Sequence, residues 1–303
     1  MRRETLKRLS GDVRLPFELR SHLAYLYHRR TWPGGLPVTV NQKIRWKMLK
    51  DRNPLLTTFA DKRAVRDYVA ERVGPDVLTH LHAIVADPDE LDFDALPREF
   101  VLKPSHGSNG VWIVTTQAPP GGRLPAKVWD HGITHPDETD RAQLIAAARG
   151  WLGSNLGREA LEWAYLNVEP RLLVEELLVS QGHAPDEYKL WTFHGKVRMV
   201  RLISNMFGDH RTAFYSPNWE RLEVRSLMKG RLPEPLPFPP DSLDRMIEIA
   251  ERLAGDIDFV RVDLYDVGDR VVFGEPTNYP AGAKDRWEPA SFDDWLGSWW
   301  HLD

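Results

Sequence analysis

Two pairs of alternating segments constrain the fold of this chain more than any other feature. In each segment apolar and polar side chains alternate, and a short polar turn separates the two members of a pair. A period of two residues interrupted by such a turn predicts an antiparallel β-hairpin. The pairs are 187–193 with 196–203, and 259–265 with 270–276.

Helical patterns flank these hairpins. Asp61 and Asp241 each precede a run with apolar residues three or four apart, so both are predicted helix caps. Helices are predicted over 1–30, 41–52, 60–74, 137–155 and 241–256. Further strands are predicted over 99–103, 111–115 and 171–178, and loops over 31–37, 117–136 and 229–240.

The order of these elements indicates an α+β fold, because strands and helices do not alternate as βαβ units. The first two of the further strands form a third predicted hairpin. A boundary near residue 97, where helices give way to strands, divides the chain into 1–97 and 98–303.

Composition narrows the class of protein. The 303 residues include no cysteine, which excludes disulfides, thiolate metal sites and cysteine nucleophiles, and fits a reducing, cytoplasmic compartment. A net charge of −4 gives no general attraction for nucleic acid. No apolar run reaches the ~20 residues of a membrane span, so stable membrane insertion is not expected. Basic residues crowd the first 30 positions, where a solvated helical face is preferred over an acidic partner or membrane surface.

The first candidate site is Lys103 with the loop 105–110. A lysine at a strand end followed by a glycine loop suits a triphosphate, because backbone N–H groups can turn toward phosphate oxygens. No Lys-Ser/Thr follows Gly110, so this is not a Walker A loop. An ordinary hairpin turn with an edge lysine is the alternative.

The second candidate is the pair Asp263 and Glu275, on the two arms of the last hairpin. Asp263 shares a strand face with Arg261, and Glu275 shares one with Thr277. If odd-numbered residues of one arm pair with odd-numbered residues of the other, both carboxylates lie on the same face of the hairpin. Two carboxylates with nucleotide oxygens are typical ligands of Mg²⁺. A solvated strand face is the alternative.

The third candidate is the pair Glu175 and Glu176 at the end of an apolar strand. One of the two carboxylates can face a ligand, since successive strand residues point opposite ways. Accepting both ribose hydroxyls is a common use of such an acid. Lys189 on the next strand shares this cleft or faces solvent.

Other patterns are weaker. His131 and His135 lie in a segment read as loop, and His80 and His82 are isolated, so a zinc site is not expected. The sequence has no GxSxG motif. Two Asp-x-Asp triplets, 87–89 and 92–94, match the metal site of a glycosyltransferase but lie in a polar loop.

Five segments taken in order resemble the ATP-grasp superfamily, and more narrowly its TupA-like branch, which is linked to teichuronopeptide and other surface-polymer biosynthesis. The resemblance implies two α+β subdomains that clamp ATP, preceded by a helical N-terminal region. It assigns 1–97 to that region and the first subdomain, and 98–303 to the nucleotide-binding and catalytic domain. The segments are 60–69, 99–114, 167–178, 187–200 and 259–280.

The resemblance also implies roles for single residues. Lys62 would reach the nucleotide phosphates, and Lys103 the α and β phosphates. Glu175 or Glu176, with the backbone that follows to Leu178, would hold adenine and ribose. The flexible lid over the phosphates would comprise His106, Gly107, Ser108 and Gly110.

Its remaining implications concern the reacting phosphate. Lys189 would line the cleft, and Arg261 would face the transferred phosphate. Asp263 and Glu275 would carry magnesium, with Thr277 as third ligand. Related ligases commonly have asparagine at that third position, whereas here Asn278 comes one residue later and alternation turns it away.

The implied activity is that of a carboxylate–amine ligase that uses ATP and Mg²⁺ and forms an amide through an acylphosphate. Its partners would be small-molecule or polymer-end carboxylates and amines, and a homodimer is left open. Three alternatives are a kinase that stops at phosphoryl transfer, a glycosyltransferase, and a non-catalytic nucleotide-binding protein of surface-polymer assembly.

Overall fold

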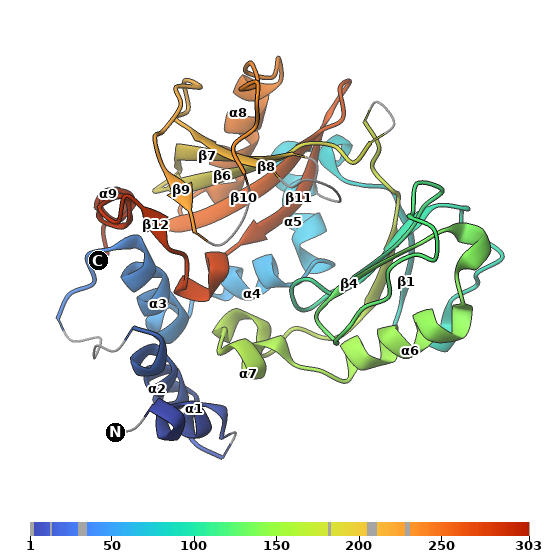
Figure 1. Cartoon of the computed structure of the whole chain (residues 1–303), viewed down its shortest axis with the longest axis horizontal. Coiled ribbons are helices and arrows are strands. Elements are labelled where there is room, and N and C mark those ends of the chain that lie inside the picture. The colour runs from blue at the N-terminus through green and yellow to red at the C-terminus, as the bar shows by residue number, and fades with distance from the viewer. Residues whose placement is uncertain are drawn as a thin grey trace.

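The chain builds two five-stranded sheets with helices around them (Figure 1). The computed structural model describes residues 3–12, 14–29, 35–180, 183–204, 211–227 and 231–302. The α-helices are α1 (Arg3–Gly11), α2 (Phe17–Arg29), α3 (Val40–Lys50), α4 (Pro54–Ala60), α5 (Ala64–Val73), α6 (Arg141–Leu152), α7 (Leu156–Ala160), α8 (Leu243–Ala254) and α9 (Phe292–Ser298). Short 3₁₀ turns are η1 (Pro75–Val77), η2 (Pro88–Glu90), η3 (Pro136–Glu138), η4 (Trp163–Tyr165) and η5 (Pro280–Ala283).

The first sheet has the strand order β1-β5-β2-β3-β4. All its pairs are antiparallel except β3–β4, which is parallel, and β2–β3 is the predicted hairpin. Its apolar side packs against α6, with Trp112 and Trp151 at the centre of that core. The strands are β1 (Leu81–Val85), β2 (Phe100–Pro104), β3 (Val111–Val114), β4 (His131–Thr134) and β5 (Leu172–Glu175).

The second sheet has the order β11-β10-β6-β7-β8 and is antiparallel throughout. Both predicted hairpins lie in it. Helix α8 packs against β6, β7 and β10. The strands are β6 (Glu187–Phe193), β7 (Lys196–Ser204), β8 (Arg211–Tyr215), β10 (Phe259–Asp266) and β11 (Val271–Thr277), and a small ribbon pairs β9 (Arg225–Ser226) with β12 (Trp287–Glu288).

One face of the second sheet changes character along its strands. At one end its aromatic side chains pack on the C-terminal segment: Phe193 and Phe259 meet Trp300, and Trp191 meets Trp287. Further along the same strands, positions two residues apart carry charges instead. The aromatic end therefore anchors the sheet, and the charged end is left for a polar site.

The N-terminal helices lie at one end of the molecule, below α3 in Figure 1. The predicted helical region 1–30 forms two helices, and Gly11 and Pro16 flank the break between them. Helix α3 begins at a capping box made by Thr39 and Gln42, and it packs against α9. The α+β class is thus confirmed.

Several details of the sequence prediction were wrong. The segment 117–136 is not all loop, because it contains β4, and the strand predicted over 171–178 ends at Glu175. Ser242, not Asp241, precedes helix α8, and its side chain makes no capping hydrogen bond. The strands β1 and β8 and the helices α4 and α9 were not predicted.

One further prediction holds in part, and others are untested. The Asp61 carboxylate accepts hydrogen bonds from the N–H groups of Arg63 and Ala64, but the residue that precedes α5 is Arg63, whose side chain makes no capping hydrogen bond. Parts of the predicted loops 31–37 and 229–240 lie outside the described residues. The boundary at residue 97 stays a prediction, although β1, which precedes it, pairs with β5, which follows it.

Candidate functional site

A row of charged side chains crosses the second sheet at right angles to its strands. In the pairing register Glu275 stands opposite Asp263, Asp263 opposite Lys189, and Lys189 opposite Arg201. The predicted meeting of the two carboxylates on one face is therefore confirmed. A bulge follows the first pair at Gly274, where a Cβ would lie 3.1 Å from the Asp263 carbonyl oxygen.

Asp263 is the most enclosed member of the row, with no exposed surface. Arg261 donates to both its oxygens, at 2.6 Å from Nε and 2.5 Å from one terminal nitrogen, and Lys189 Nζ lies 2.5 Å from Oδ2. Burial alone would raise the pKa of Asp263, but these two cations hold it below its ordinary value. The same ion pair outweighs burial at Arg261 and raises that pKa. Asp263 and Arg261 therefore form a charged pair.

Glu275 is more open, with 36% of its side chain exposed. Its Oε1 lies 3.8 Å from Arg261, and the Thr277 hydroxyl lies 3.5 Å from the same oxygen. Arg261 also donates to that hydroxyl at 2.9 Å. Asn278 points the other way and donates to the carbonyl of Leu56, as strand alternation predicts. Thr277, not Asn278, thus shares the face of the two carboxylates.

The donor set fits Mg²⁺ in a specific way. No group of three or more His, Cys, Asp or Glu side chains in the described part of the chain is arranged to hold a metal. Asp263 already meets two cations, while Glu275 faces outward. Two carboxylates without a third acid suit a magnesium ion that takes its other ligands from phosphate and water. The metal role of Asp263, Glu275 and Thr277 stays a prediction.

A second cluster of charges lies at the edge of the first sheet. Lys103 Nζ is 2.7 Å from Glu175 Oε2, and Arg66 approaches the other oxygen at 3.4 Å. Burial would raise the pKa of Glu175, but Lys103 and Arg66 lower it. Burial lowers the pKa of Lys62, which donates to the Gly107 carbonyl at 2.6 Å.

The two clusters face one another. Lys62, Lys103 and Glu175 line the same small cavity, of about 10 Å³, as Glu275 from the second sheet. The fold therefore brings both predicted phosphate lysines, Lys103 of the first sheet and Lys62 of the α4–α5 turn, to the predicted metal acid of the second sheet.

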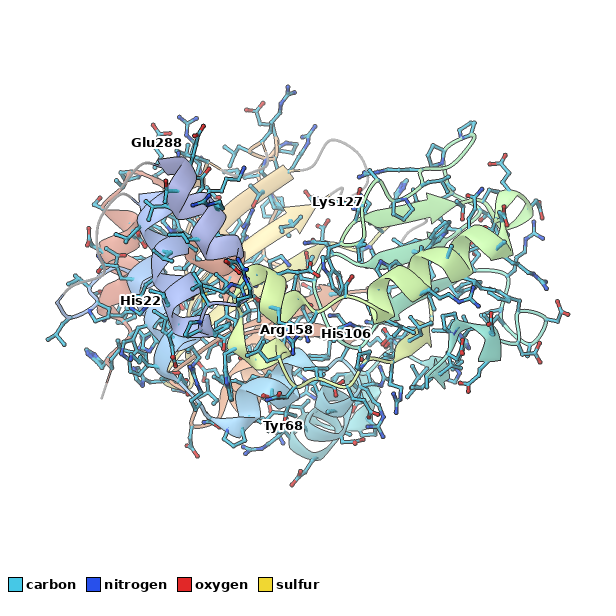
Figure 2. The ribbon with its side chains drawn as sticks, turned by 90° about the horizontal axis from the view of Figure 1, so that it is seen from below. His22, Tyr68, His106, Lys127, Arg158 and Glu288 are labelled. Carbon is cyan, nitrogen blue, oxygen red and sulfur yellow. The ribbon has the colours of Figure 1, made fainter. Side chains whose placement is uncertain are left out.

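The glycine loop is tied down at its start. The ring Nε2 of His106 lies 3.1 Å from the carbonyl oxygens of Trp151 and Ser154, so the ring lies beside the segment between α6 and α7 (Figure 2). Gly107 has φ +106°, and a Cβ there would lie 2.3 Å from the Trp129 ring. Only glycine fits under that ring. Ser108 and Gly110 complete the loop, whose motion stays a prediction.

A larger cavity, of about 520 Å³, lies beside the segment that follows β5. This volume is within the range of roughly 300–1,000 Å³ common for small-molecule sites. Its wall is mainly apolar and includes Ile113, Ile133, Leu177 and the predicted Leu178, with Asp186 among the polar members. The Glu176 carboxylate, by contrast, accepts from the His80 N–H and from Arg270, both at 2.8 Å.

Comparison with known proteins places the chain. The family model described as TupA-like ATP-grasp matches residues 42–124 and 133–300. The chain belongs to the TupA-like ATP-grasp family. The resemblance drawn from the five sequence segments is thereby confirmed.

Solved structures give weaker similarities. D-alanine–D-alanine ligase from Bacillus anthracis is 16% identical, with 74% of this chain and 59% of that chain covered and a TM-score of 0.41. PurK, an N5-carboxyaminoimidazole ribonucleotide synthetase in complex with ADP, is 12% identical, with 79% and 51% covered and a TM-score of 0.44. VanG D-Ala:D-Ser ligase from Enterococcus faecalis is 15% identical, with 74% and 54% covered and a TM-score of 0.40.

The matched region spans little more than half the length of these solved proteins. Because the identities and TM-scores are low, the family assignment rests on the family model alone. A search of curated proteins gave no match. Among the described helices, none is both long and apolar enough to cross a membrane.

Sequence reasoning missed three polar residues of this ATP-grasp site. Glu187, two residues before Lys189, places Oε1 2.6 Å from the lysine, while its Oε2 is buried and has no hydrogen-bond partner among the described residues. Burial raises the pKa of Glu187. The Tyr265 hydroxyl lies 3.4 Å from the same carboxylate, and Arg201 stands opposite Lys189. Each of the three lies an even number of residues from Lys189 or Asp263 along the predicted hairpins. Strand alternation could therefore have placed them on the same face of the sheet.

Proposed function

We propose that this chain is an ATP-dependent carboxylate–amine ligase that forms an amide through an acylphosphate and releases ADP and phosphate. One observation carries the proposal: Lys62, in the turn between α4 and α5, and Lys103 of the first sheet line the same cavity as Glu275 of the second sheet, whose strand partner is Asp263. Cations on one side and carboxylates on the other suit a magnesium triphosphate between them.

The larger cavity is the proposed base site. Its apolar wall, with Leu178, would enclose adenine. Glu175, three residues before Leu178, lines the small cavity together with the phosphate lysines. Glu175 and Glu176 are already paired with cations in the chain, so their proposed role is to fix Lys103 and the local backbone. Asp186, which lines the cavity, is the open carboxylate for the ribose hydroxyls.

The proposed chemistry needs positioning and charge compensation more than covalent help. Bound magnesium would neutralise phosphate oxygens and hold them in line with the attacking carboxylate. Arg261 and Lys189, fixed by Asp263, would stabilise the charge on the transferred phosphate. The loop 105–110, with Trp129 packed on Gly107, would cover the phosphates and exclude water, which would otherwise hydrolyse an acylphosphate.

The proposal extends to substrates and setting. The chain has no cysteine to carry a thioester, so the activated acyl group would stay on phosphate until an amine displaces it. The carboxylate and the amine would be small molecules or the end of a polymer. A cytoplasmic location follows from the use of ATP, and residues 98–303 would form the nucleotide-binding and catalytic domain.

Turnover of Mg-ATP tests this proposal. We expect ADP and phosphate to be released when the protein is screened with pairs of carboxylates and amines, and mass spectrometry should show an amide. ADP accompanied by a phosphorylated acceptor and no amide would move the assignment to a kinase.

A further inference from the structure

Arg201 is the fourth member of the charged row and lies beyond the proposed phosphate site. Its partner across the strands is Lys189 on one side and Phe214 on the other. Three strand spacings separate Arg201 from Glu275, which is roughly 14 Å between Cα atoms. Lys189 and Asp263 stand between them, so Arg201 is on the far side of Lys189 from the proposed metal ligands.

The side chain of Arg201 is held in one orientation. Its Nε donates to the Thr212 hydroxyl at 3.1 Å, and its Cζ lies 5.3 Å from the centre of the Phe214 ring. Both contacts come from β8, the neighbouring strand. These contacts occupy Nε and one face of the guanidinium. The edge formed by the two terminal nitrogens is left to face a ligand.

That edge has no partner among the described residues. Two other cations on this face, Lys189 of the row and the neighbouring Arg261, each contact two carboxylates. Within the ranges that the structure describes, Arg201 makes no ion pair, and the Thr212 hydroxyl is its one hydrogen-bond partner. Its side chain is half-buried. A fixed, half-buried guanidinium with two unused donors is a built anion site.

Arg201 remains cationic although its surroundings lower its pKa. Burial lowers its pKa and Arg261 acts in the same direction, while Asp285, Glu187 and Asp263 oppose them. Arginine stays protonated in proteins even under such burial. The cation therefore persists in the free protein and is available to a ligand.

We propose that Arg201 binds a carboxylate of the substrate through the two terminal nitrogens of its guanidinium. The planar carboxylate matches this planar fork, whereas phosphate binding at the site is already served by Arg261 and Lys189. Its place beside Lys189 sets the carboxylate next to the transferred phosphate and away from the metal pair. The choice of a substrate carboxylate as the ligand rests on the proposed ligase function. The anion site itself rests only on the geometry of Arg201.

Calorimetry with glutarate and inorganic phosphate tests the proposal. Each probe is titrated into the full chain saturated with magnesium and a nonhydrolysable ATP analogue, which occupies the triphosphate site. We expect wild type to bind glutarate and Arg201→Gln to bind it at least about tenfold more weakly. Arg201→Lys, which keeps the charge but loses the fork, should fall between them.

Arg198→Gln is the matched control. Arg198 lies on the same strand and packs over Trp299 at 4.2 Å, so this change removes the same charge elsewhere. Its glutarate affinity should equal that of wild type. All variants should bind the ATP analogue as wild type does, and melting curves show whether they are folded.

Three results would overturn the proposal: wild type that binds no glutarate, Arg201 variants that bind it undiminished, or wild type that binds phosphate but not glutarate. None of these readouts needs turnover. Loss of glutarate binding in Arg201→Gln together with no amide formation by wild type would keep the anion site and reject the ligase. Amide formation by wild type together with undiminished glutarate binding by Arg201→Gln would keep the ligase and reject the anion site.

Discussion

Charges of opposite sign alternate at the residue scale of this site. Asp263 lies between Lys189 and Arg261, and each of these cations reaches a further acid, Glu187 or Glu275. Buried charges are tolerated only when they are paired, and removal of one partner leaves the other uncompensated. The alternation therefore explains how one face of the sheet can carry five ionisable side chains and still fold.

Neutralising either proposed metal ligand should stop turnover. We expect Asp263→Asn and Glu275→Gln each to lower Mg-ATP turnover at least about 100-fold, because each removes a carboxylate from phosphate and metal binding. Asp263→Asn should also lower the melting temperature more, since Asp263 is fully buried and Glu275 is not. Glu288→Gln, an equal charge change in an exposed ion pair, is the control. Wild-type rates in both variants would refute the metal assignment.

A second prediction at this scale concerns pH. Glu162 Oε1 and Lys284 Nζ lie 3.5 and 3.7 Å from the position that a Cβ on Gly282 would take. Burial raises the pKa of Glu162 to about 7, from an ordinary value of 4.5. The folded state then binds the proton more tightly, so this group stabilises the fold fully below pH 4.5 and loses that contribution as the pH rises to about 7.

Melting temperatures between pH 4 and 8, measured without nucleotide or magnesium, check this. Glu162→Gln cannot titrate at this position. We therefore expect the melting temperature of wild type, relative to that of the variant, to be higher at low pH and to fall as the pH rises. A difference independent of pH would show that the Glu162 pKa is not raised.

The glycine loop is the element whose behaviour matters most. His106 anchors its first residue, and Trp129 packs on Gly107, while the Trp129 indole donates to Glu159 at 2.7 Å. The loop is thus fastened to the backbone at the end of α6 and, through Trp129, to a side chain of α7. Bound phosphate would add contacts that only the closed loop makes.

We predict that 107–110 exchanges amide hydrogen more slowly when a nonhydrolysable ATP analogue and magnesium are bound. His106 should change less, because its ring is held in the free protein. The turn 267–269 on β10–β11 is the internal control. Equal protection of 107–110 with and without the ATP analogue would show that this loop does not close over the nucleotide.

Elements with a strong internal pattern were predictable from sequence, and edge elements were not. The hairpins of the second sheet carry a clear period of two because one face is apolar throughout. Strand β4 lies in a segment rich in proline and glycine, and its parallel pairing with β3 is decided by tertiary contact. Strand β1 pairs with β5, some 90 residues later, which no local pattern reveals.

At the scale of the whole molecule, the site exists only because the two sheets face each other. Strand alternation placed Asp263 and Glu275 together in advance, but only the family resemblance, and no local pattern, implied that Glu275 would lie near Lys62 and Lys103. Arg201 was missed for a similar reason. It belongs to no motif, and only its pairing with Lys189 across the strands reveals that it lies in the charged row.

Both sheets also contribute to the ion pair between Glu176, after β5, and Arg270, on the β10–β11 turn. This ion pair ties the first sheet to the second. The proposed activation of a carboxylate as an acylphosphate therefore depends on the assembled molecule.

Hydroxylamine tests that claim most directly, because it traps an acylphosphate as a hydroxamate. Wild type is incubated with Mg-ATP and a panel of carboxylates, with hydroxylamine and without an amine, and Asp263→Asn is the matched blank. We predict that hydroxamate accumulates in step with ADP for the correct carboxylate and is absent from the blank. A stable phosphorylated product with no hydroxamate would contradict the account and identify a kinase instead.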